Sequence, residues 1–168
     1  MLTLCGSGAI APDEAVCRSE WATCTRNREI LAVLQQAGAL RRSPGEILEL
    51  HIRTSALQVT ACDLAFFGAV LGSGGLDPRS GRRLVDAGVV RIVCTILFQC
   101  GMYNASGPFA LSVGLPAKSG VGGGIAAAGP GLGIGVYGPA LDGCGNSVGG
   151  QKVLEHLSQA LKLHWFDL

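Results

Sequence analysis

The spacing of apolar residues changes once along the chain, near residue 107. Before that point apolar side chains recur every three or four positions, which is typical of helices with one buried face. The spacing predicts a helix from residue 13 to about residue 36, with Gly38 as the glycine that ends it. The apolar stripe of this predicted helix consists of Ile30, Leu31, Val33 and Leu34.

The residues at two further positions predict the starts of helices. Ser43 can cap a helix whose first position is Pro44, and Glu46 completes a capping box. Thr60 is the same kind of N-cap, with Asp63 in the first turn, where a carboxylate interacts favourably with the helix dipole. This second helix is expected to end at Gly72. A turn-rich loop over 74–78 and a long apolar helix over about 86–99 are expected to follow.

After residue 107 the pattern favours strands. Phe109, Leu111 and Val113 alternate with small residues, and the segments 118–128 and 132–137 are predicted as two more strands joined by a turn at 129–131. A helix over 146–161 closes the chain. The order is therefore helices, three antiparallel strands and a C-terminal helix, an α+β arrangement. Three strands alone make a thin sheet with exposed edges, which indicates that part of the fold is missing.

Composition agrees with a folded domain and excludes several partners. Hydrophobic residues make up 48% and charged residues 15% of the 168 positions, so disorder is not expected. The net charge of +1 gives no reason to expect nucleic acid or a membrane as partner. The uncharged stretch 120–141 has the length of a membrane-spanning helix, but its nine glycines and two prolines favour a glycine-rich hairpin instead.

The cysteines indicate a reducing compartment. Their number, seven, is odd, and no two have the spacing of a zinc site or of a disulfide framework. With no convincing targeting segment at the N-terminus, a cytoplasmic location is expected, without metal and without cofactor.

The sequence Lys118-Ser119-Gly120, followed by more glycines, is the clearest chemical motif. It is not a phosphate-binding loop, because Ala117 stands where that motif requires glycine before its lysine. A Lys-Ser-Gly that opens an inner strand is instead similar to the K-T-G of β-lactamases, which works with a distant S-x-x-K nucleophile. A plain glycine-rich edge hairpin with a solvated lysine is the alternative.

The sequence around this motif resembles the serine-dependent glutaminases over roughly residues 13–165. We therefore expect an unmatched N-terminal segment, 1–12, and an incomplete glutaminase-like domain, 13–168. The resemblance implies a β-lactamase/DD-peptidase-like fold whose N-terminal part is missing. The matching segments are Ser19-Glu20, Arg26-Asn27, Thr60, Asp63-Leu64-Ala65, Cys100 to Tyr103, Ser106-Gly107, Phe109-Ala110, Val113 to Gly124 and Gly145-Asn146-Ser147.

The resemblance also implies a reaction and a set of site residues. Glutamine would be hydrolysed to glutamate and ammonia through an acyl-enzyme, in an enzyme that forms dimers or tetramers. Glu20 and Asn27 would bind the α-amino and α-carboxylate groups of glutamine, on one face if a single helix carries both. Tyr103 would transfer protons or polarise the amide, Lys118 would add positive potential, and the Val121 backbone would contact substrate. Read alone, Glu20 is a solvent-facing residue and Tyr103 a half-buried packing residue.

Two departures from the family leave the activity open. His51 stands where the family has a second active-site tyrosine; it is a candidate for proton transfer or a structural residue at a helix end. No S-x-x-K occurs, since Leu115, Gly149 and Gln159 stand three positions before the lysines. Gly8-Ala9-Ile10 is only a short match to a family segment. The chain is therefore half of a glutaminase site, an inactive remnant that at most binds glutamine, or a more distant β-lactamase or peptidase relative.

Overall fold

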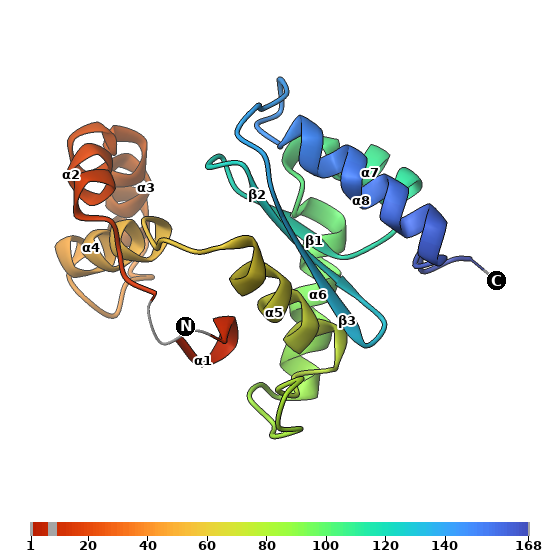
Figure 1. Ribbon diagram of the computed structural model, residues 1–168. Helices are drawn as coiled ribbons and strands as arrows, with labels where there is room; N and C mark the ends of the chain where they lie inside the picture. Colours follow the sequence, from red (N-terminus) through yellow and green to blue (C-terminus); the bar gives the residue numbers. More distant parts are fainter. Residues whose placement is uncertain (1, 7–9, 168) are drawn as a thin grey trace. The chain divides into compact units, whose positions relative to one another are not determined.

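The structure is a computed structural model that describes residues 2–6 and 10–167 (Figure 1). Its internal contacts divide the chain into two compact units. Of the described residues, unit 1 contains 2–6 and 59–167, and unit 2 contains 10–58. The short match at Gly8-Ala9-Ile10 falls largely outside the described residues.

Unit 2 consists of three short helices around a small core. They are α2 (Glu14–Thr23), α3 (Thr25–Gln36) and α4 (Pro44–Ser55). Asp13 caps α2 by accepting hydrogen bonds from the amides of Ala15 and Val16. At the other end of the helix pair, Gly38 follows the C-cap with a φ of 66°, as predicted. The buried apolar residues of this unit are Cys17, Cys24, Leu31, Leu48, Ile52 and Ala56.

The prediction of one helix from residue 13 to 36 is wrong at one position. Cys24, with φ −79° and ψ 34°, separates α2 from α3. Its buried thiol donates to the carbonyl of Trp21, and the guanidinium of Arg28 lies 5.8 Å from the centre of the Trp21 ring. Of the predicted apolar stripe, only Leu31 is buried, because within unit 2 only one face of α3 meets other helices.

The predicted capping box of Ser43 with Glu46 and the predicted N-cap Thr60 are both confirmed. Ser43 and Glu46 exchange side chain-to-backbone hydrogen bonds at the start of α4, and Thr60 and Asp63 do the same at the start of α5 (Ala61–Gly72). Each box satisfies amides that the first helical turn leaves without an intrahelical partner. The two helices therefore begin where the sequence places them.

Unit 1 is built on a three-stranded antiparallel sheet in the order β1-β2-β3. The strands are β1 (Ala117–Ser119), β2 (Gly124–Gly129) and β3 (Leu132–Tyr137), and the predicted turn at 129–131 is confirmed by the pairing of Gly129 with Leu132. The helices of this unit are α1 (Leu2–Cys5), α5, α6 (Ala87–Cys100), the 3₁₀ turn η1 (Tyr103–Ala105), α7 (Ser106–Ser112) and α8 (Val148–Leu161).

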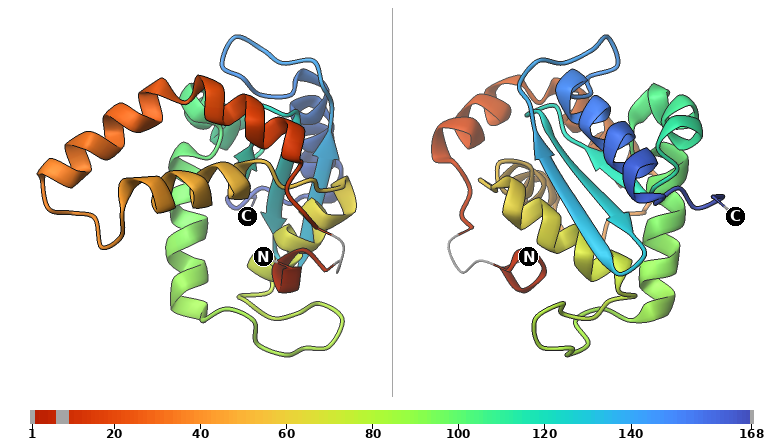
Figure 2. Two further views of the ribbon diagram at one scale, coloured as in Figure 1. Left: turned by 90° about the vertical axis from the view of Figure 1, so that its left-hand side faces the viewer. Right: turned by 45° about the vertical axis from the view of Figure 1, so that its right-hand side comes forward.

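The two faces of β3 meet different helices, because side chains alternate along a strand. Leu132, Ile134 and Val136 pack on the main core, which contains Leu154 of α8. The intervening glycines face α5, and α8 crosses the strands in the right-hand view of Figure 2. The main core consists of Met102, Phe109, Val113, Leu115, Ala117, Ile125, Ala127, Leu154 and Leu163.

Helix α5 approaches the sheet so closely that side chains are excluded at the contact. A Cβ on Gly68 would lie 2.3 Å from the carbonyl oxygen of Ala127, and one on Gly133 would lie 2.0 Å from the amide nitrogen of Ala69. Both distances are far below van der Waals contact, so glycine is the residue that permits this packing. Part of the glycine excess in the sequence is explained in this way.

The predicted strand around Phe109, Leu111 and Val113 is instead helix α7. Phe109 and Val113 are buried and Leu111 is 83% exposed, so the buried pair is spaced by four, as on a helix face. The predicted strand 118–128 is divided by a turn at 120–123, where Gly123 has a φ of 92°. The number of strands is still three, because the predicted strand 118–128 forms two strands and the predicted strand around Phe109 forms none.

No single helix in the described ranges is long and apolar enough to cross a membrane. One pair of helices, Ala87–Cys100 and Tyr103–Ser112, is together long and apolar enough to cross a membrane, but the two helices meet at an angle of 90°.

Candidate functional site

Tyr103 and Lys118 meet at one backbone oxygen in unit 1. The Tyr103 hydroxyl donates a 3.1 Å hydrogen bond to the carbonyl oxygen of Ser119, and the Lys118 ammonium donates to the same oxygen. The Lys118 nitrogen also lies 4.5 Å from the centre of the Tyr103 ring, within range of a cation–π interaction. Two residues predicted from the sequence to be catalytic are thus brought together.

Strand β1 explains how Lys118 reaches this position. Its residues alternate, with Ala117 and Ser119 buried and Lys118 exposed between them. The strand is fixed on both sides, because it pairs with β2 and the Ser119 amide donates to the carbonyl of Gly101. The lysine therefore extends from a rigid strand that contacts the end of α6, directly before Tyr103.

Tyr103 has an unusual backbone conformation. Its φ is 52°, in the left-handed region, where a side chain with a Cβ costs about 1–3 kcal/mol. The Ser106 hydroxyl accepts from the Met102 amide at 3.0 Å and donates to the Tyr103 carbonyl at 2.8 Å. From the other side, the Asn146 side-chain amide donates to the Met102 carbonyl at 3.2 Å. The peptide groups on both sides of the tyrosine are therefore held.

The loop that carries Asn146 is organised by Asp142. One carboxylate oxygen of Asp142 accepts from the amides of Cys144 and Asn146, and the other accepts from the Gln151 side chain. These hydrogen bonds, led by the one from the Asn146 amide, hold the pKa of the Asp142 carboxyl below its usual value. The loop is thus stabilised by a carboxylate that stays charged at neutral pH.

The same loop lies near Val121. A Cβ on Gly145 would be 3.6 Å from Val121 Cγ1 and 3.9 Å from Tyr103 Cε2. Val121 is 71% exposed and Tyr103 is 37% exposed, so both present atoms to solvent beside the exposed Lys118. All three predicted site residues of unit 1 therefore gather at the C-terminal end of β1.

In unit 2 the structure brings Asn27 and His51 together. Both line a hollow of about 240 Å³ between α3 and α4, whose walls are otherwise aliphatic. Glu20 lies on α2 and is exposed. The break at Cys24 means that Glu20 and Asn27 are not on one continuous helix, so the condition for a shared face is not met.

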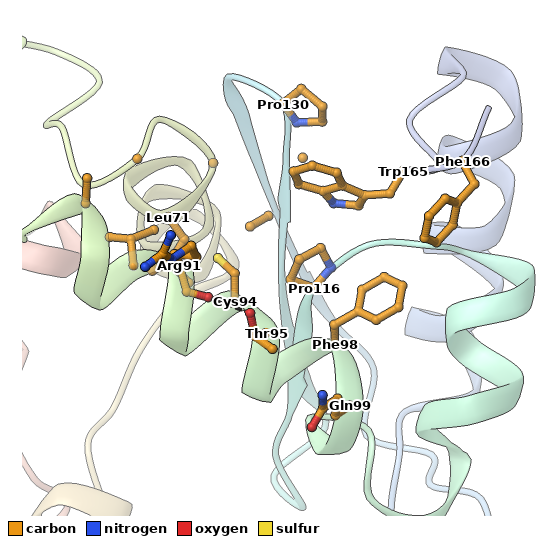
Figure 3. A pocket seen from close by; sticks show the side chains of 16 residues that line it. Leu71, Arg91, Cys94, Thr95, Phe98, Gln99, Pro116, Pro130, Trp165 and Phe166 are labelled. Atoms are coloured by element: carbon orange, nitrogen blue, oxygen red, sulfur yellow. Dashed lines mark hydrogen bonds between the residues drawn. The ribbon is translucent and has the colours of Figure 1, made fainter. Parts of the chain in front are cut away.

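A larger apolar hollow in unit 1 was not anticipated from the sequence. It measures about 520 Å³ and lies between α6, the turn of the hairpin and the residues that follow α8 (Figure 3). Phe98, Pro116 and Trp165 line it, and burial raises the pKa of the Cys94 thiol on its wall. None of the predicted site residues lines this hollow.

Comparison with known proteins decides the family, since the glutaminase family model matches residues 1–166. The chain belongs to the glutaminase family. It is 49% identical over 152 residues to a glutaminase of Clostridioides difficile, a match that covers 90% of this chain and 49% of that protein. It is 46% identical over 164 residues to a glutaminase of Geobacillus thermodenitrificans, covering 97% of this chain and 53% of the relative. This glutaminase-family chain spans about half the length of these relatives.

Solved glutaminase structures confirm the fold expected from the resemblance. A Bacillus subtilis glutaminase in covalent complex with 5-oxo-L-norleucine superposes with a TM-score of 0.93 at 38% identity, over 98% of this chain and 59% of that one. A probable glutaminase of the same species gives a TM-score of 0.92 at 37% identity, over 98% of this chain and 56% of that one. The α+β, β-lactamase-like fold is therefore shared.

Sequence reasoning missed the residues that hold Tyr103 in place. Ser106 and Asn146 lie within segments that resemble the family, but no spacing rule connects positions 40 residues apart to the same peptide groups. The positive φ of Tyr103 left no signal either, because tyrosine is not a residue that marks such a conformation.

Proposed function

We propose that this chain forms one wall of a glutamine-hydrolysing site, and that the serine nucleophile comes from sequence outside these 168 residues. The reaction is hydrolysis of L-glutamine to L-glutamate and ammonia through an acyl-enzyme. The observation that carries the proposal is the convergence of the Tyr103 hydroxyl and the Lys118 ammonium on the Ser119 carbonyl.

The chemistry of this pair suits amide hydrolysis. An ammonium beside a phenol stabilises negative charge that develops on the phenol oxygen or on a reacting amide oxygen. The hydroxyl can donate or accept a proton within the same short range. The exposed side chains of Tyr103, Lys118 and Val121 are accessible to a substrate at the C-terminal end of β1.

In unit 2, three residues are proposed to bind the ends of glutamine. Glu20 offers a carboxylate for the α-amino group, and Asn27 offers an amide donor for the α-carboxylate. His51 lines the same hollow as Asn27 and has an imidazole, which can move protons near neutral pH. The ring of His51 is smaller than that of the tyrosine that the family has at this position. The variant His51→Tyr tests whether the imidazole itself is needed.

The nucleophile is proposed to lie elsewhere because no serine stands three residues before any of the three lysines. A diazo ketone provides a direct test, since the B. subtilis relative forms a covalent adduct by reaction with 6-diazo-5-oxo-L-norleucine. The probe is added to this chain alone, and to this chain mixed with the part of the C. difficile glutaminase that it does not match. Mass spectrometry then identifies the chain that carries the adduct.

The expected result is no adduct and no ammonia release from this chain alone, and an adduct on the added part together with ammonia release from the mixture. An adduct on a residue of this chain would overturn the placement of the nucleophile. A mixture that binds neither probe nor glutamine would overturn the proposed reaction as a whole.

The role of the Tyr103 and Lys118 pair is tested in the same mixture. Tyr103→Phe removes only the hydroxyl and is expected to slow ammonia release by about 10²–10⁴-fold. Lys118→Met removes the charge at nearly constant volume and is expected to cost about 10²–10³-fold. Lys152→Met on the exposed face of α8 is the matched control and leaves the rate within about twofold. Equal rates for Lys118→Met and Lys152→Met would contradict the assignment.

A second candidate is a chain that binds glutamine without turning it over, favoured by the same absence of S-x-x-K. Calorimetric titration with glutamine separates the two. Binding by a monodisperse sample that stays inactive in every mixture supports the second candidate. A chromogenic β-lactam is expected to remain intact, and its hydrolysis would favour a β-lactamase-like activity instead.

Assembly into dimers or tetramers and a cytoplasmic location complete the proposal. All seven cysteines are free thiols, and Cys62, Cys100 and Cys144 are exposed, which suits a reducing compartment. Light scattering of the purified chain tests assembly, and a purely monomeric mass in the active mixture would contradict it.

A further inference from the structure

We propose that Asn146 is a positioning residue that fixes Tyr103 in its left-handed conformation and so aims the phenol at Lys118 and the Ser119 carbonyl. The inference rests on the proposed function only for its catalytic consequence. The positioning itself is a property of unit 1 and is measurable without turnover.

The need for such a residue follows from the backbone. Tyr103 opens the turn η1, separated from the end of helix α6 by Gly101 and Met102 alone, and has φ 52°, a backbone conformation that residues with a Cβ rarely adopt. Unless neighbouring groups hold it, the peptide would relax to negative φ, and the ring would point elsewhere. The hydroxyl, by contrast, is needed at one place, 3.1 Å from the Ser119 oxygen.

Asn146 is suited to hold it. Its side chain is fully buried, and its Nδ2 donates to the carbonyl of Met102, which belongs to the peptide bond that enters Tyr103. Ser106 secures the other end of that segment through the Met102 amide and the Tyr103 carbonyl. With the Met102 carbonyl fixed on one side and the Tyr103 carbonyl on the other, little freedom remains for φ of Tyr103.

The polar balance of Asn146 supports a role in aiming rather than in general stability. Its Oδ1 is buried without a hydrogen-bond partner within the described part of the chain. Leaving a buried carbonyl unpaired is unfavourable, so asparagine carries a cost in stability at this place. What an apolar residue cannot supply is the donor to Met102.

Asp142 in turn holds the backbone of Asn146. Its carboxylate accepts from the Asn146 backbone amide at 2.9 Å and from the Gln151 side chain at 2.8 Å. The neighbouring Ser147 has a different task, since its hydroxyl accepts from the Gly150 amide and caps α8. The adjacent buried residues Asn146 and Ser147 thus make different hydrogen bonds, so a change at Ser147 is a matched control for a change at Asn146.

Nuclear magnetic resonance of the tyrosine rings tests the proposal in the full chain. The chain has two tyrosines, Tyr103 and the 66% exposed Tyr137, so each ring signal is assigned by Tyr137→Phe. In the unaltered chain a nuclear Overhauser contact is expected between the Tyr103 ring and the ε-methylene of Lys118. Tyr137 is the internal reference for a solvent-exposed ring.

Asn146→Leu nearly keeps the size of the side chain and removes the donor. The contact to Lys118 is expected to disappear, and the Tyr103 ring shifts move toward those of Tyr137. Ser106→Ala, which opens the other side of the same segment, is expected to give the same loss. Ser147→Ala weakens the cap of α8 and lowers the melting temperature, yet leaves the Tyr103 contact intact.

The proposal is overturned if Asn146→Leu keeps the contact, or if Ser147→Ala abolishes it to the same degree at temperatures where both variants are folded. In the active mixture, Asn146→Leu is expected to lower kcat at least tenfold with KM within about twofold. If the mixture of unaltered chains shows no turnover, the proposed function fails, while the ring contact still decides whether Asn146 positions Tyr103.

Discussion

The two units hold their site residues in different ways. In unit 1, Tyr103 and Lys118 are joined through the Ser119 carbonyl, and the peptide groups around Tyr103 are fixed by buried polar side chains. In unit 2, Asn27 and His51 only line a common hollow, and Glu20 lies exposed on a separate helix. The predicted site residues of unit 1 are held by hydrogen bonds, and those of unit 2 are an exposed glutamate and two residues that share a hollow.

The cores of the units explain this difference. Unit 1 has a sheet between helices and contains several large side chains that are at most 1% exposed, among them Met102, Leu115 and Leu154. Unit 2 has three short helices, and its six core residues include two cysteines and an alanine. Precise placement of a catalytic group requires a rigid support, which unit 1 provides and unit 2 provides to a lesser degree.

The sharpest way to break this comparison is to separate α5 from the sheet. Gly68→Ala places a methyl group 2.3 Å from the Ala127 carbonyl oxygen, where neither backbone can move without unpacking unit 1. We expect a loss of at least about 3 kcal/mol, at the upper end for overpacked sites. Urea unfolding followed by circular dichroism measures it, and hydrogen exchange assigns the loss to β2 and β3.

The control is Gly107→Ala on α7, where a Cβ would meet nothing within 4 Å and φ is not positive. It is expected to be neutral or slightly stabilising, because alanine has a higher helix propensity than glycine. A Gly68→Ala variant as stable as Gly107→Ala would mean that α5 does not pack directly on the strands.

A comparable or smaller effect is expected from shortening one core leucine in each unit. Leu154→Ala removes a side chain with no exposed surface and is expected to cost about 3–5 kcal/mol, while Leu31→Ala, at 9% exposure, is expected to cost about 2 kcal/mol. Hydrogen exchange is expected to show that each loss is confined to its own unit. Equal losses would show that the two cores are equally tight.

The smallest effect is a response of unit 2 to acid. Hydrogen bonds from the amides of Val16 and Ala15 hold the pKa of the Asp13 carboxyl below its usual value. A carboxyl with a lowered folded pKa stabilises the fold above its unfolded pKa, and this contribution is lost as the pH falls through the folded pKa. The cap of α2 is therefore expected to weaken below about pH 4.

Asp13→Asn is the matched change, since an asparagine still caps a helix but does not titrate in this range. Melting of α2, followed by hydrogen exchange from pH 3 to pH 7, is expected to depend less on pH in this variant. An unchanged pH dependence would place the acid-sensitive group elsewhere, with the Glu46 carboxyl, whose pKa is also lowered by its bonds to Ser43, as the next candidate.

The helix starts could be predicted because their causes are local. Ser43 with Glu46, and Thr60 with Asp63, satisfy free amides within four residues, and no distant contact alters that outcome. The segment 109–113 was mistaken for a strand because Phe109 and Val113 fit both a period of two and a helical spacing of four. Only the buried core on one side and solvent around Leu111 decide between them.

The site residues also differ in how far the sequence could predict them. Tyr103, Lys118 and Val121 could be placed by resemblance, and the structure brings them together. The supporting residues Ser106 and Asn146 could not, since their contacts depend on how α6, η1 and the loop after β3 meet in space. The break between α2 and α3 at Cys24 could not be predicted, because no glycine or proline stands there.

The positions of the two tryptophans have a practical consequence. Trp21 lies in unit 2 beneath the Arg28 guanidinium, and Trp165 lies in unit 1 on the wall of the apolar hollow. Each unit therefore has its own intrinsic fluorophore. Trp21→Phe leaves emission that reports on unit 1 alone, and Trp165→Phe leaves emission that reports on unit 2, so the melting of each can be followed in one chain without added label.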